Sequence, residues 1–489
     1  MSLIAGPTPY PATKPSGIPW LGDVPKHWEI QRGKSLFRCI DVRSSTGQEE
    51  LLTVSSERGV VPRSSASVTM FKAESYVGYK LCWPGDLVIN SLWAWGRGLG
   101  VSRYHGIVSS AYGVYRLRPG FESYARYIHE LVRSAPFNWE LQVRSKGIWI
   151  SRLQLTDEAF LEAPFPVPPE PDQLAIVRYL DHADRRIRRH IRAKQRLIGL
   201  LEEQKQVIVH RAVTRGLEPN VRFKPSGVEW LEEMPENWEV KRAKAVCSAI
   251  IDCKNRTPAA IDGGPYIVVR TTCVRNGRFG LNGSYRTDES NYRIWTARGA
   301  PRAGDVFFTR EAPAGEACLV PERTDLCMGQ RMMYLRPDPQ MLDARFLLLN
   351  IYGPLTRKYV ELVTNGSTVG HLRLGQVYAL PLLWCPLEEQ QAIVRHVAEA
   401  TKDIDTAISS AHREISLLRE YRTRLVADVV TGKLDVRAAA AKLPEAGAEN
   451  GDASDLSDAS DASDLSDRSD ESDASDVSDE ALTEAEAAP

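Results

Sequence analysis

Residues 15–34 read PSGIPWLGDVPKHWEIQRGK, and residues 225–244 read PSGVEWLEEMPENWEVKRAK. Ten of the twenty positions are identical at a constant offset of 210, and Trp28 matches Trp238. A repeat of this length is too long for a solenoid unit, whose period is about 20–50 residues. The sequence therefore predicts a duplicated unit made of a globular domain and a helix, which would present two related surfaces to a two-part target.

A second repeated stretch follows each copy of the first. DQLAIVRYLDHADRRI begins at Asp172 and EQQAIVRHVAEATKDI begins at Glu389, at an offset of 217. Apolar residues step by three or four positions along both stretches, which is the pattern of one face of an α-helix. The two seams match each other position by position. Their members are Ile176, Leu180, Ile187, Ile191, Ile198, Leu201 and Ile208 in the first helix, and Ile393, Val397, Ile404, Ile408, Ile415, Leu418 and Leu425 in the second.

A narrow apolar seam on a polar helix predicts a partner helix. Because the seams match, we expect the two helices to pair with each other as an antiparallel coiled coil. Parallel packing against other helices is the alternative. Lys194 and Lys205 fall within the first seam, where Ala411 and Arg422 occupy the second. These lysines either extend to solvent or fix the register of the pair.

The segments between the repeated stretches predict a mixed fold. Short apolar and aromatic runs such as DLVINSLWAW and YIVVRTT are separated by Gly and Pro turns, as in the strands of an irregular domain. Residues 84–87 (PGDL) match residues 303–306 (AGDV), and residues 125–127 match residues 344–346. We therefore expect an α+β fold with two similar globular domains, related by a pseudo-two-fold axis and joined by the paired long helices.

The expected domain boundaries follow the repeats. They are a first globular region at 1–165, a long helix at 166–218, a second globular region at 219–383, a second long helix at 384–437 and a tail at 438–489. The tail repeats a Ser-Asp unit that buries too little apolar surface to offset the entropy of ordering, so we expect it to be disordered. It would solubilise the protein or shield a basic surface.

The charge of the chain is unevenly distributed. The net charge is −1, but residues 441–489 contain sixteen acidic and two basic residues, so the remaining 440 residues carry a net charge of +13. A basic body indicates an anionic partner, and nucleic acid is the commonest one. A mildly basic protein without such a partner is the alternative.

Cysteine usage and hydropathy indicate the compartment. Eight cysteines are scattered without a CxxC pair, which fits reduced thiols better than a disulfide framework or a zinc site. No apolar run of about 18 residues could span a membrane, and the start MSLIAGPTPY lacks the features of a signal peptide. We expect a cytoplasmic protein.

Catalytic and cofactor motifs are missing from the sequence. There is no GxxxxGK[ST] phosphate loop, no Asn-Pro-Pro-aromatic or Asp-Pro-Pro-aromatic tetrapeptide of amino-methylating enzymes, no HExxH and no Cys/His metal spacing. The glycine-rich run GRGLG at 96–100 is interpreted as a turn. Residues 203–205 (EQK) match a nuclease fragment by chance, because they lie on the long helix. We expect no catalytic residues, no metal ligands and no cofactor on this chain.

Polar side chains in the turn-rich stretches are the candidates for DNA contact, since Arg, Lys, Asn and His donate to phosphates and base edges. Trp93 and Trp95 lie among them, and their alternation on a predicted strand favours core packing. The candidates are Arg58, Arg63, Lys72, Arg97, Arg103 and His105 in the first region, and Lys254, Asn255, Arg256, Arg270, Arg275, Asn276, Arg278, Arg310 and Arg331 in the second.

These features resemble the specificity subunit of type I restriction-modification systems. The resemblance rests on PSGIPWLGDVPKHWE, PEPDQLAIVRYLD, PSGVEWLEEMPENWE, PLEEQQAIVRHV and VVTGKLDVR, together with IIDCKNRTP and PYIVVRTTCVRNG near the start of the second variable region. It extends over residues 15–437, and the acidic tail lies outside it. Each motif alone is weak, but the duplicated combination is specific.

The resemblance implies a function in DNA recognition. Each globular region would be a target-recognition domain that reads one half of a bipartite duplex target, and the paired helices would set the gap between the halves. The chain would dock two methyltransferase (modification) subunits and two restriction subunits. S-adenosylmethionine, ATP and magnesium would then belong to those partners.

Two other interpretations remain open at the level of sequence. The chain could be a standalone DNA-modifying enzyme, or a coiled-coil scaffold without a DNA-recognition role. The basic body and the divergent variable regions argue against the scaffold.

Overall fold

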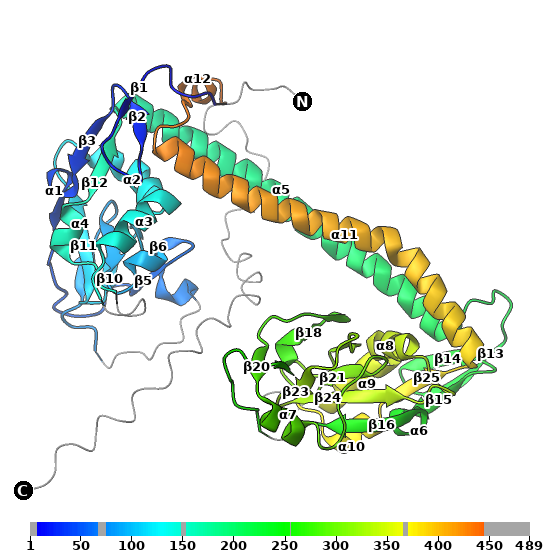
Figure 1. Ribbon diagram of the computed structural model, residues 1–489. Helices are drawn as coiled ribbons and strands as arrows, with labels where there is room; N and C mark the ends of the chain where they lie inside the picture. The colour runs from blue at the N-terminus through cyan, green and yellow to red at the C-terminus, as the bar shows by residue number, and fades with distance from the viewer. Residues whose placement is uncertain (1–6, 67–74, 148–152, 255, 365–369, 445–489) are drawn as a thin grey trace, which may run out of the picture. The chain divides into compact units, whose positions relative to one another are not determined.

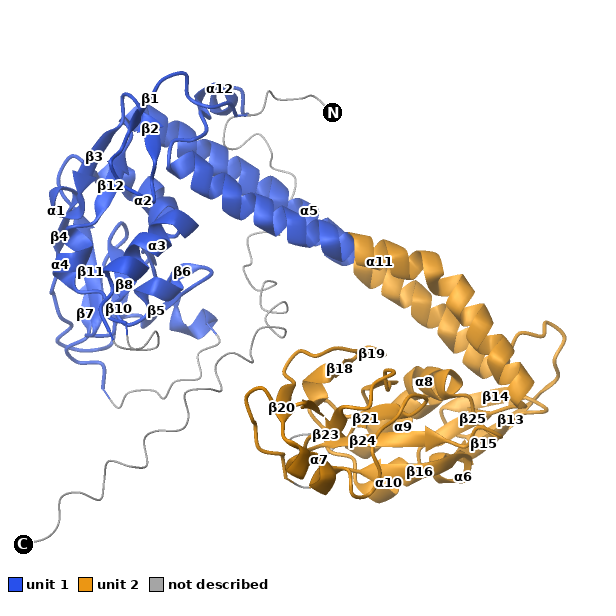
Figure 2. Cartoon of the chain, viewed as in Figure 1, with its two compact units in different colours: residues 1–196, 411–453 blue, residues 197–410, 454–489 orange. Residues whose placement is uncertain are grey.

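The computed structural model describes residues 7–66, 75–147, 153–254, 256–364 and 370–444. The chain forms two compact units, unit 1 from residues 1–196 and 411–453, and unit 2 from residues 197–410 and 454–489 (Figure 2). Both long helices cross from one unit to the other, so each unit contains part of each helix.

Unit 1 is built around a four-stranded antiparallel sheet with strand order β4-β11-β8-β9 (Figure 1). Small two-stranded sheets surround it. The elements are β1 (Thr13–Pro15), β2 (Asp23–Pro25), β3 (Glu29–Arg32), α1 (Gly33–Leu36), β4 (Phe37–Cys39), β5 (Leu52–Ser55), β6 (Gly59–Pro62), β7 (Lys80–Cys82), β8 (Leu87–Asn90), β9 (Leu99–Val101), β10 (Gly106–Val108), β11 (Tyr112–Leu117), α2 (Ala125–Val132), α3 (Ala135–Arg144), α4 (Asp157–Leu161), β12 (Pro164–Val167), the first part of α5 (Glu170–Arg215), the last part of α11 (Leu387–Val430) and α12 (Arg437–Ala441).

Unit 2 repeats this plan with strand order β16-β24-β21-β22 and adds a three-stranded sheet, β20-β17-β23. In that second sheet β17 and β23 are parallel. The elements are β13 (Phe223–Val228), β14 (Leu231–Pro235), β15 (Glu239–Arg242), α6 (Ala243–Val246), β16 (Cys247–Asp252), β17 (Tyr266–Val269), β18 (Val274–Arg275), β19 (Arg278–Phe279), β20 (Tyr285–Thr287), α7 (Glu289–Trp295), β21 (Val306–Thr309), β22 (Ala317–Leu319), β23 (Leu326–Met328), β24 (Met332–Pro337), α8 (Ala344–Tyr352), α9 (Pro354–Thr364), α10 (Leu374–Tyr378) and β25 (Pro381–Trp384).

The central sheet of each unit is buried on both faces. Successive strand residues point to opposite faces, so Leu87 and Ile89 pack with α2 and α3, whereas Val88 packs with β5, β6 and β10. In unit 2, Phe308 likewise joins the cluster of α8 and α9, and Phe307 joins that of β17 and β23. The α+β fold class predicted from the sequence is confirmed.

The repeated tryptophan box joins each globular region to the start of a long helix. The buried Trp28 indole Nε1 donates to Asp172 in the first turn of α5 at 3.0 Å. The buried Trp238 Nε1 donates to Glu389 in the first turn of α11 at 2.9 Å. A carboxylate at a helix N-terminus is stabilised by the helix dipole. The same carboxylate therefore accepts the indole hydrogen bond and stabilises the start of the helix. This shared contact explains why the box and the helix start recur together.

Two further sequence matches between the halves also correspond to contacts that both units make. Tyr127 on α2 and Phe346 on α8 each lie edge-on to the box tryptophan of their own unit, with ring centroids 6.5 Å apart in both cases. The Gly-Asp motifs place a buried carboxylate on an arginine of the neighbouring strand. Asp86 binds Arg116 through two 2.7 Å hydrogen bonds.

Asp305 binds Arg336 in the same bidentate way, also with two 2.7 Å bonds. Both aspartates are almost fully buried, with 1% of the residue surface exposed. A bidentate carboxylate–guanidinium pair fixes the position of both strands that carry it. The matched motifs therefore belong to the scaffold of each unit.

The long helices pair in antiparallel orientation, as predicted. In unit 1, Asp184 on α5 contacts Arg422 on α11, and Lys194 further along α5 contacts Glu414, an earlier residue of α11, at 2.7 Å. Because one residue number rises as the other falls, the helices run in opposite directions. In unit 2, Lys205 binds Asp405 at 2.7 Å. The two seam lysines therefore make interhelical ion pairs, which favours their role in fixing the register.

All fourteen predicted seam residues are at least partly buried. Ten are buried, and Ile191, Leu201, Ile208 and Leu418 are partly exposed. The ends of the seams do more than pair helices, since Ile176 and Leu180 join the core of unit 1 and Ile393 and Val397 join the core of unit 2. The expected pseudo-two-fold relation between the halves stays a prediction.

The predicted start of the tail at residue 438 is wrong. Residues 437–441 form α12, and Ala439, Ala440 and Leu443 are buried in unit 1. The Arg178 guanidinium donates to the carbonyl oxygen of Pro444 at 3.2 Å. The run of alanines buries apolar surface, which the Ser-Asp composition that follows it could not do. The Ser-Asp repeat itself, within residues 445–489, lies outside the described residues.

No helix among the described residues is long and apolar enough to cross a membrane.

Candidate nucleic-acid interface

A short hairpin of unit 2 carries three of the predicted DNA contacts. Strands β18 and β19 pair Arg275 with Arg278 and are joined by Asn276 and Gly277. Both turn residues have positive φ, 48° for Asn276 and 78° for Gly277, as a two-residue Asn-Gly hairpin turn requires. Arg275, Asn276 and Arg278 are exposed, and the Arg278 guanidinium also donates to Asp405 on α11 at 3.3 Å. The structure therefore gathers these predicted residues on one turn.

Buried polar groups hold this turn in place. The Glu316 carboxylate accepts from the Asn276 amide at 2.6 Å, and the Tyr352 hydroxyl accepts from the Gly277 amide at 2.8 Å. The hydroxyl also donates to Glu316 at 2.9 Å, and Arg357 donates to the same carboxylate at 3.1 Å. Burial raises the pKa of Tyr352 to about 12, so its hydroxyl stays neutral and keeps its proton. Neither Glu316 nor Tyr352 was among the residues predicted from the sequence.

The loops at one end of the β16-β24-β21-β22 sheet bring a second set together. β16 ends beside the start of β24, where Asp252 pairs with Met333, and β21 ends there too, where Thr309 pairs with Met332. The predicted contacts in these loops are Lys254, Arg256, Arg310 and Arg331. They form a group separate from the β18–β19 turn along the chain.

The members of this second set differ in their freedom to meet DNA. Arg256 is exposed, and its backbone carbonyl accepts from the Trp295 Nε1 at 3.0 Å, while its guanidinium has no partner among the described residues. Lys254 lies with its Nζ 5.6 Å from the Trp295 ring centroid. Arg331 contacts Glu311 but keeps half of its side chain exposed. Arg256 is therefore the candidate of this set with the freest guanidinium.

Arg310 is withdrawn from the candidate DNA contacts. Only 12% of its side chain is exposed, and its guanidinium binds both oxygens of Asp252 at 2.8 and 3.0 Å. Its Nε donates to the carbonyl of Leu372 at 3.0 Å, and a third nitrogen lies 3.2 Å from His371. Because its donors are engaged, Arg310 ties three loops together. Sequence alone could not place Asp252 beside it.

The remaining predicted contact of unit 2, Arg270, lies at the end of β17 and is exposed. Its guanidinium approaches the carbonyl of Gly283 at 3.5 Å, so it stays largely free. Lys72 of the first region and Asn255 of the second lie outside the described residues.

In unit 1 the structure brings together the segments that carry Arg58 and Arg97. Arg58 lies in the β5–β6 turn, and Arg97 lies in the loop between β8 and β9. Arg133, which follows α2, bridges the two segments by donating to the carbonyls of Ser56 and Leu99, both at 2.7 Å. Burial lowers the pKa of Arg133 to about 10, which leaves it protonated at neutral pH. Arg133 is a further residue that sequence analysis missed.

Other predicted contacts of unit 1 lie elsewhere. Arg103 and His105 are exposed in the loop between β9 and β10, at the opposite end of β9 from Arg97, and the His105 ring lies 5.4 Å from that of Trp83. Arg63 begins a short 3-10 helix after β6 and is partly exposed. The predicted set of unit 1 is thus spread over two ends of the sheet.

The core role expected for Trp93 is wrong. Trp93 follows β8, caps a 3-10 helix at Ala94–Gly96 and is 38% exposed. A Cβ on Gly96 would lie 2.3 Å from the Trp93 indole nitrogen, and Arg97 adopts φ 62°. The ring therefore lies over Gly96 and Gly98, which explains these two glycines. Residues 96–98 form the predicted turn, whereas Leu99 and Gly100 already belong to β9.

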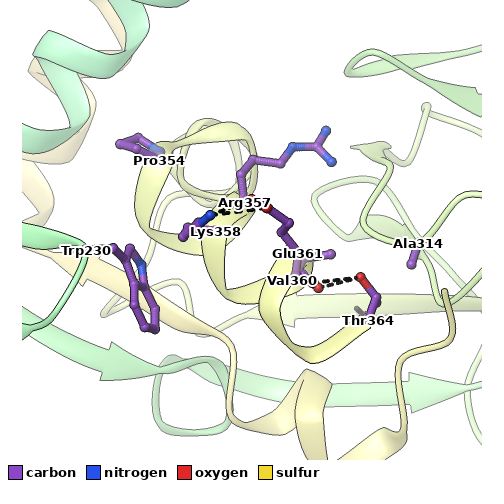
Figure 3. Close-up of a pocket in the computed structure, with 8 residues that line it drawn as sticks. All are labelled: Trp230, Ala314, Pro354, Arg357, Lys358, Val360, Glu361 and Thr364. Atoms are coloured by element: carbon purple, nitrogen blue, oxygen red, sulfur yellow. Dashed lines mark hydrogen bonds and ion pairs between the residues drawn. The ribbon is translucent and has the colours of Figure 1, made fainter. Parts of the chain in front are cut away.

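A shallow hollow of about 730 Å³ lies against α9 in unit 2 (Figure 3). Trp230 lines one side, and Lys358 pairs with Glu361 at 3.0 Å on the helix. Arg357 extends away from Trp230 toward its carboxylate partner Glu316. The charged groups of this hollow are thus paired. Among the described residues, no three His, Cys, Asp or Glu side chains gather as metal ligands do.

Comparison with known proteins agrees with this organisation. Residues 235–411 match the family model described as type I restriction modification DNA specificity domain. A chain solved for the structural basis of complex assembly and conformational transition of the type I R-M system aligns with a TM-score of 0.56 and 17% identity, over 84% of this chain and 99% of that one. This likeness shows a shared fold.

Two other solved structures are more distant. The HsdS subunit from Thermoanaerobacter tengcongensis aligns with a TM-score of 0.39 and 17% identity, over 84% of this chain and 98% of that chain. The type I restriction-modification S subunit from M. genitalium aligns with a TM-score of 0.32 and 11% identity, over 82% and 96%. Residues 235–411 of this chain are thus similar to the type I restriction modification DNA specificity domain.

Proposed function

We propose that this chain is the DNA sequence-specificity subunit of a type I restriction-modification complex and binds a bipartite duplex target. Each globular region reads one half-site. The observation that carries this proposal is the contrast within the repeat. The Trp box, the Asp–Arg pairs and the helix starts make the same contacts in both units. The exposed turns differ.

Cationic turns suit the two kinds of contact that DNA recognition needs. Arg and Lys hold phosphates, and a free guanidinium can bind guanine in a bidentate way. Arg275, Arg278 and Arg256 in unit 2, and Arg97 and Arg103 in unit 1, are exposed on loops anchored to buried sheets. The different spacing of these cations in the two units supports two different half-sites.

We further propose that the long helices dock two methyltransferase subunits and, with them, two restriction subunits. Leu197, Leu200 and Val207 on α5 are 41%, 57% and 67% exposed, and Leu417 and Tyr421 on α11 are 57% and 52% exposed. Apolar residues three or four apart on one helix face favour a helical partner. These residues lie outside the buried seam, so they are available to such a partner.

On this proposal the chain itself is non-catalytic. The partner subunits bind the methyl donor, S-adenosylmethionine. They also bind the ATP and magnesium used for restriction. The complex acts in the cytoplasm, where it meets the DNA. A standalone modifying enzyme is the second candidate, and it predicts that the purified chain cuts or methylates DNA when supplied with magnesium and S-adenosylmethionine.

The test is an exchange of residues 1–165 for the corresponding region of another specificity subunit. The holocomplex with the exchanged chain should methylate a target in which only one half of the sequence has changed. A change in both halves, or in neither, would contradict the division of labour. If the complex fails to bind duplex DNA at low salt, a coiled-coil scaffold becomes the better interpretation.

A further inference from the structure

Residues 133 and 352 occupy equivalent positions in the two halves. They are 219 apart, which is also the offset between residues 84–87 and 303–306. Each lies at the end of the helix that packs on the central sheet, since Arg133 follows α2 and Tyr352 ends α8. Each side chain reaches across the edge strand, β9 or β22, to a β-hairpin turn.

In unit 2 the contact uses a hydroxyl. The Tyr352 oxygen accepts from the amides of Gly277 at 2.8 Å and of Ala317 at 3.2 Å, and it lies 2.9 Å from Glu316 and 3.1 Å from the Ala317 carbonyl. A hydroxyl has one donor and two acceptor sites, so this position satisfies all of them. The Arg357 guanidinium lies 4.3 Å from the Tyr352 ring centroid.

In unit 1 the contact uses a guanidinium. Arg133 donates to the Leu99 carbonyl on the edge strand and to the Ser55 and Ser56 carbonyls at the β5–β6 turn, at 2.7, 3.3 and 2.7 Å. An arginine offers five donors and no acceptor, which matches a turn that presents carbonyls. The chemistry of the two contacts is therefore opposite, while their position in the fold is the same.

We propose that Arg133 and Tyr352 are positioning residues that fix the recognition turn of their own unit. Tyr352 sets the pose of the Asn276–Gly277 turn, which presents Arg275 and Arg278 to DNA. Arg133 sets the pose of the β5–β6 turn with Arg58. This inference rests on the proposed function, because it assigns the turns to half-site recognition.

The contacts of Arg133 and Tyr352 with these turns explain how the two halves can differ in their hairpins and still keep the same scaffold. The hairpins of the two units present different backbone groups to these side chains, an amide to Tyr352 in unit 2 and carbonyls to Arg133 in unit 1. A new hairpin is accommodated when the residue at position 133 or 352 changes with it. The sheets and long helices then stay as they are. The residue at position 133 or 352 is thus expected to vary with the half-site that its hairpin reads.

The experiment uses the full chain in complex with its methyltransferase subunits. Tyr352→Phe removes only the hydroxyl, so the Gly277 amide loses its acceptor. Binding competition between the cognate duplex and duplexes altered in one half-site measures discrimination. We expect discrimination at the half-site of unit 2 to fall about tenfold, the effect of losing a buried hydrogen bond. Discrimination at the other half-site should not change.

Tyr359→Phe is the matched control. Its hydroxyl donates to the Gln376 carbonyl at 3.2 Å, in the same unit but away from the hairpin. Both half-sites should be read as well by this variant as by the unchanged chain. Hydrogen exchange of the complex gives an independent readout, because the Asn276 and Gly277 amides should exchange faster in Tyr352→Phe than in the control.

Unchanged discrimination or unchanged exchange of the turn amides in Tyr352→Phe would overturn the inference. An equal loss at both half-sites would assign Tyr352 a general structural role and would also overturn it. Failure of the proposed function is distinct, because the unchanged complex would then show no discrimination at either half-site.

Discussion

Each of the duplicated Asp–Arg pairs should stabilise its own unit, and this can be tested one unit at a time. Asp305→Asn breaks the bidentate pair with Arg336, whose side chain is 19% exposed while that of Asp305 is 1% exposed. Asp305 also accepts from the Arg302 amide at 2.9 Å, a bond that Asn can keep. Removing one partner of a buried pair leaves an uncompensated charge and destabilises by about 3–5 kcal/mol.

The expected magnitude translates into a readily measured shift. For a unit of this size, 1 kcal/mol corresponds to about 2–4 °C in Tm, so Asp305→Asn should lower the transition of unit 2 by roughly 6–20 °C. Calorimetry of the full chain gives the measurement. The transition of unit 1 should stay in place, and Asp86→Asn should produce the reverse pattern.

Asp325→Asn is the matched control in the same unit. Asp325 pairs with Arg323 at 2.5 Å, but the two side chains are 28% and 38% exposed. Solvent screens this exposed pair, so Tm should fall by at most a few degrees. If Asp305→Asn and Asp325→Asn shift Tm equally, burial does not determine the strength of these pairs and the reasoning is refuted.

Three further predictions concern other residues. Arg256→Ala should weaken DNA binding by about 1–3 kcal/mol and relax one position if the guanidinium binds a base edge, whereas unchanged affinity and specificity in a gel shift would make it a solvated charge. Gly277→Ala should destabilise the hairpin by roughly 1–2 kcal/mol, since φ is 78°, and urea unfolding would show no change if the turn can relax. Burial lowers the pKa of His129 to about 3, below its value in the unfolded chain. Between these two values the unfolded state binds one more proton than the folded state. Unit 1 should therefore lose stability as the pH falls from about 6.5 to 3. His129→Gln should flatten that part of the stability curve, and an unaltered curve in calorimetry would exclude this cause.

The scaffold was predictable from the sequence because its contacts are duplicated. The seam spacing predicted both long helices and their antiparallel pairing, and the Trp28 and Trp238 boxes marked where each globular region meets a helix. Repetition identified these residues because the same physical contact constrains both copies. The two Gly-Asp motifs also proved to be structural, although their partner arginines were not identified from the sequence.

The proposed recognition surface was less predictable, because charge alone does not separate free arginines from paired ones. Arg310 has the same residue type as Arg256 and lies in the same loop cluster, but Asp252 occupies its guanidinium. Arg133 and Tyr352 escaped notice because the repeat preserves their position and changes their chemistry. Such contacts depend on which loops meet at the sheet edge, which is a property of tertiary packing.

The most direct test of the central claim is the pattern of modified bases on DNA. Long-read sequencing of a host that expresses this chain with its methyltransferase subunits should show methylation at a bipartite motif with an unspecified gap of fixed length. Deletion of the chain should abolish that methylation. A contiguous motif, or methylation that persists without the chain, would contradict the assignment of one half-site to each unit.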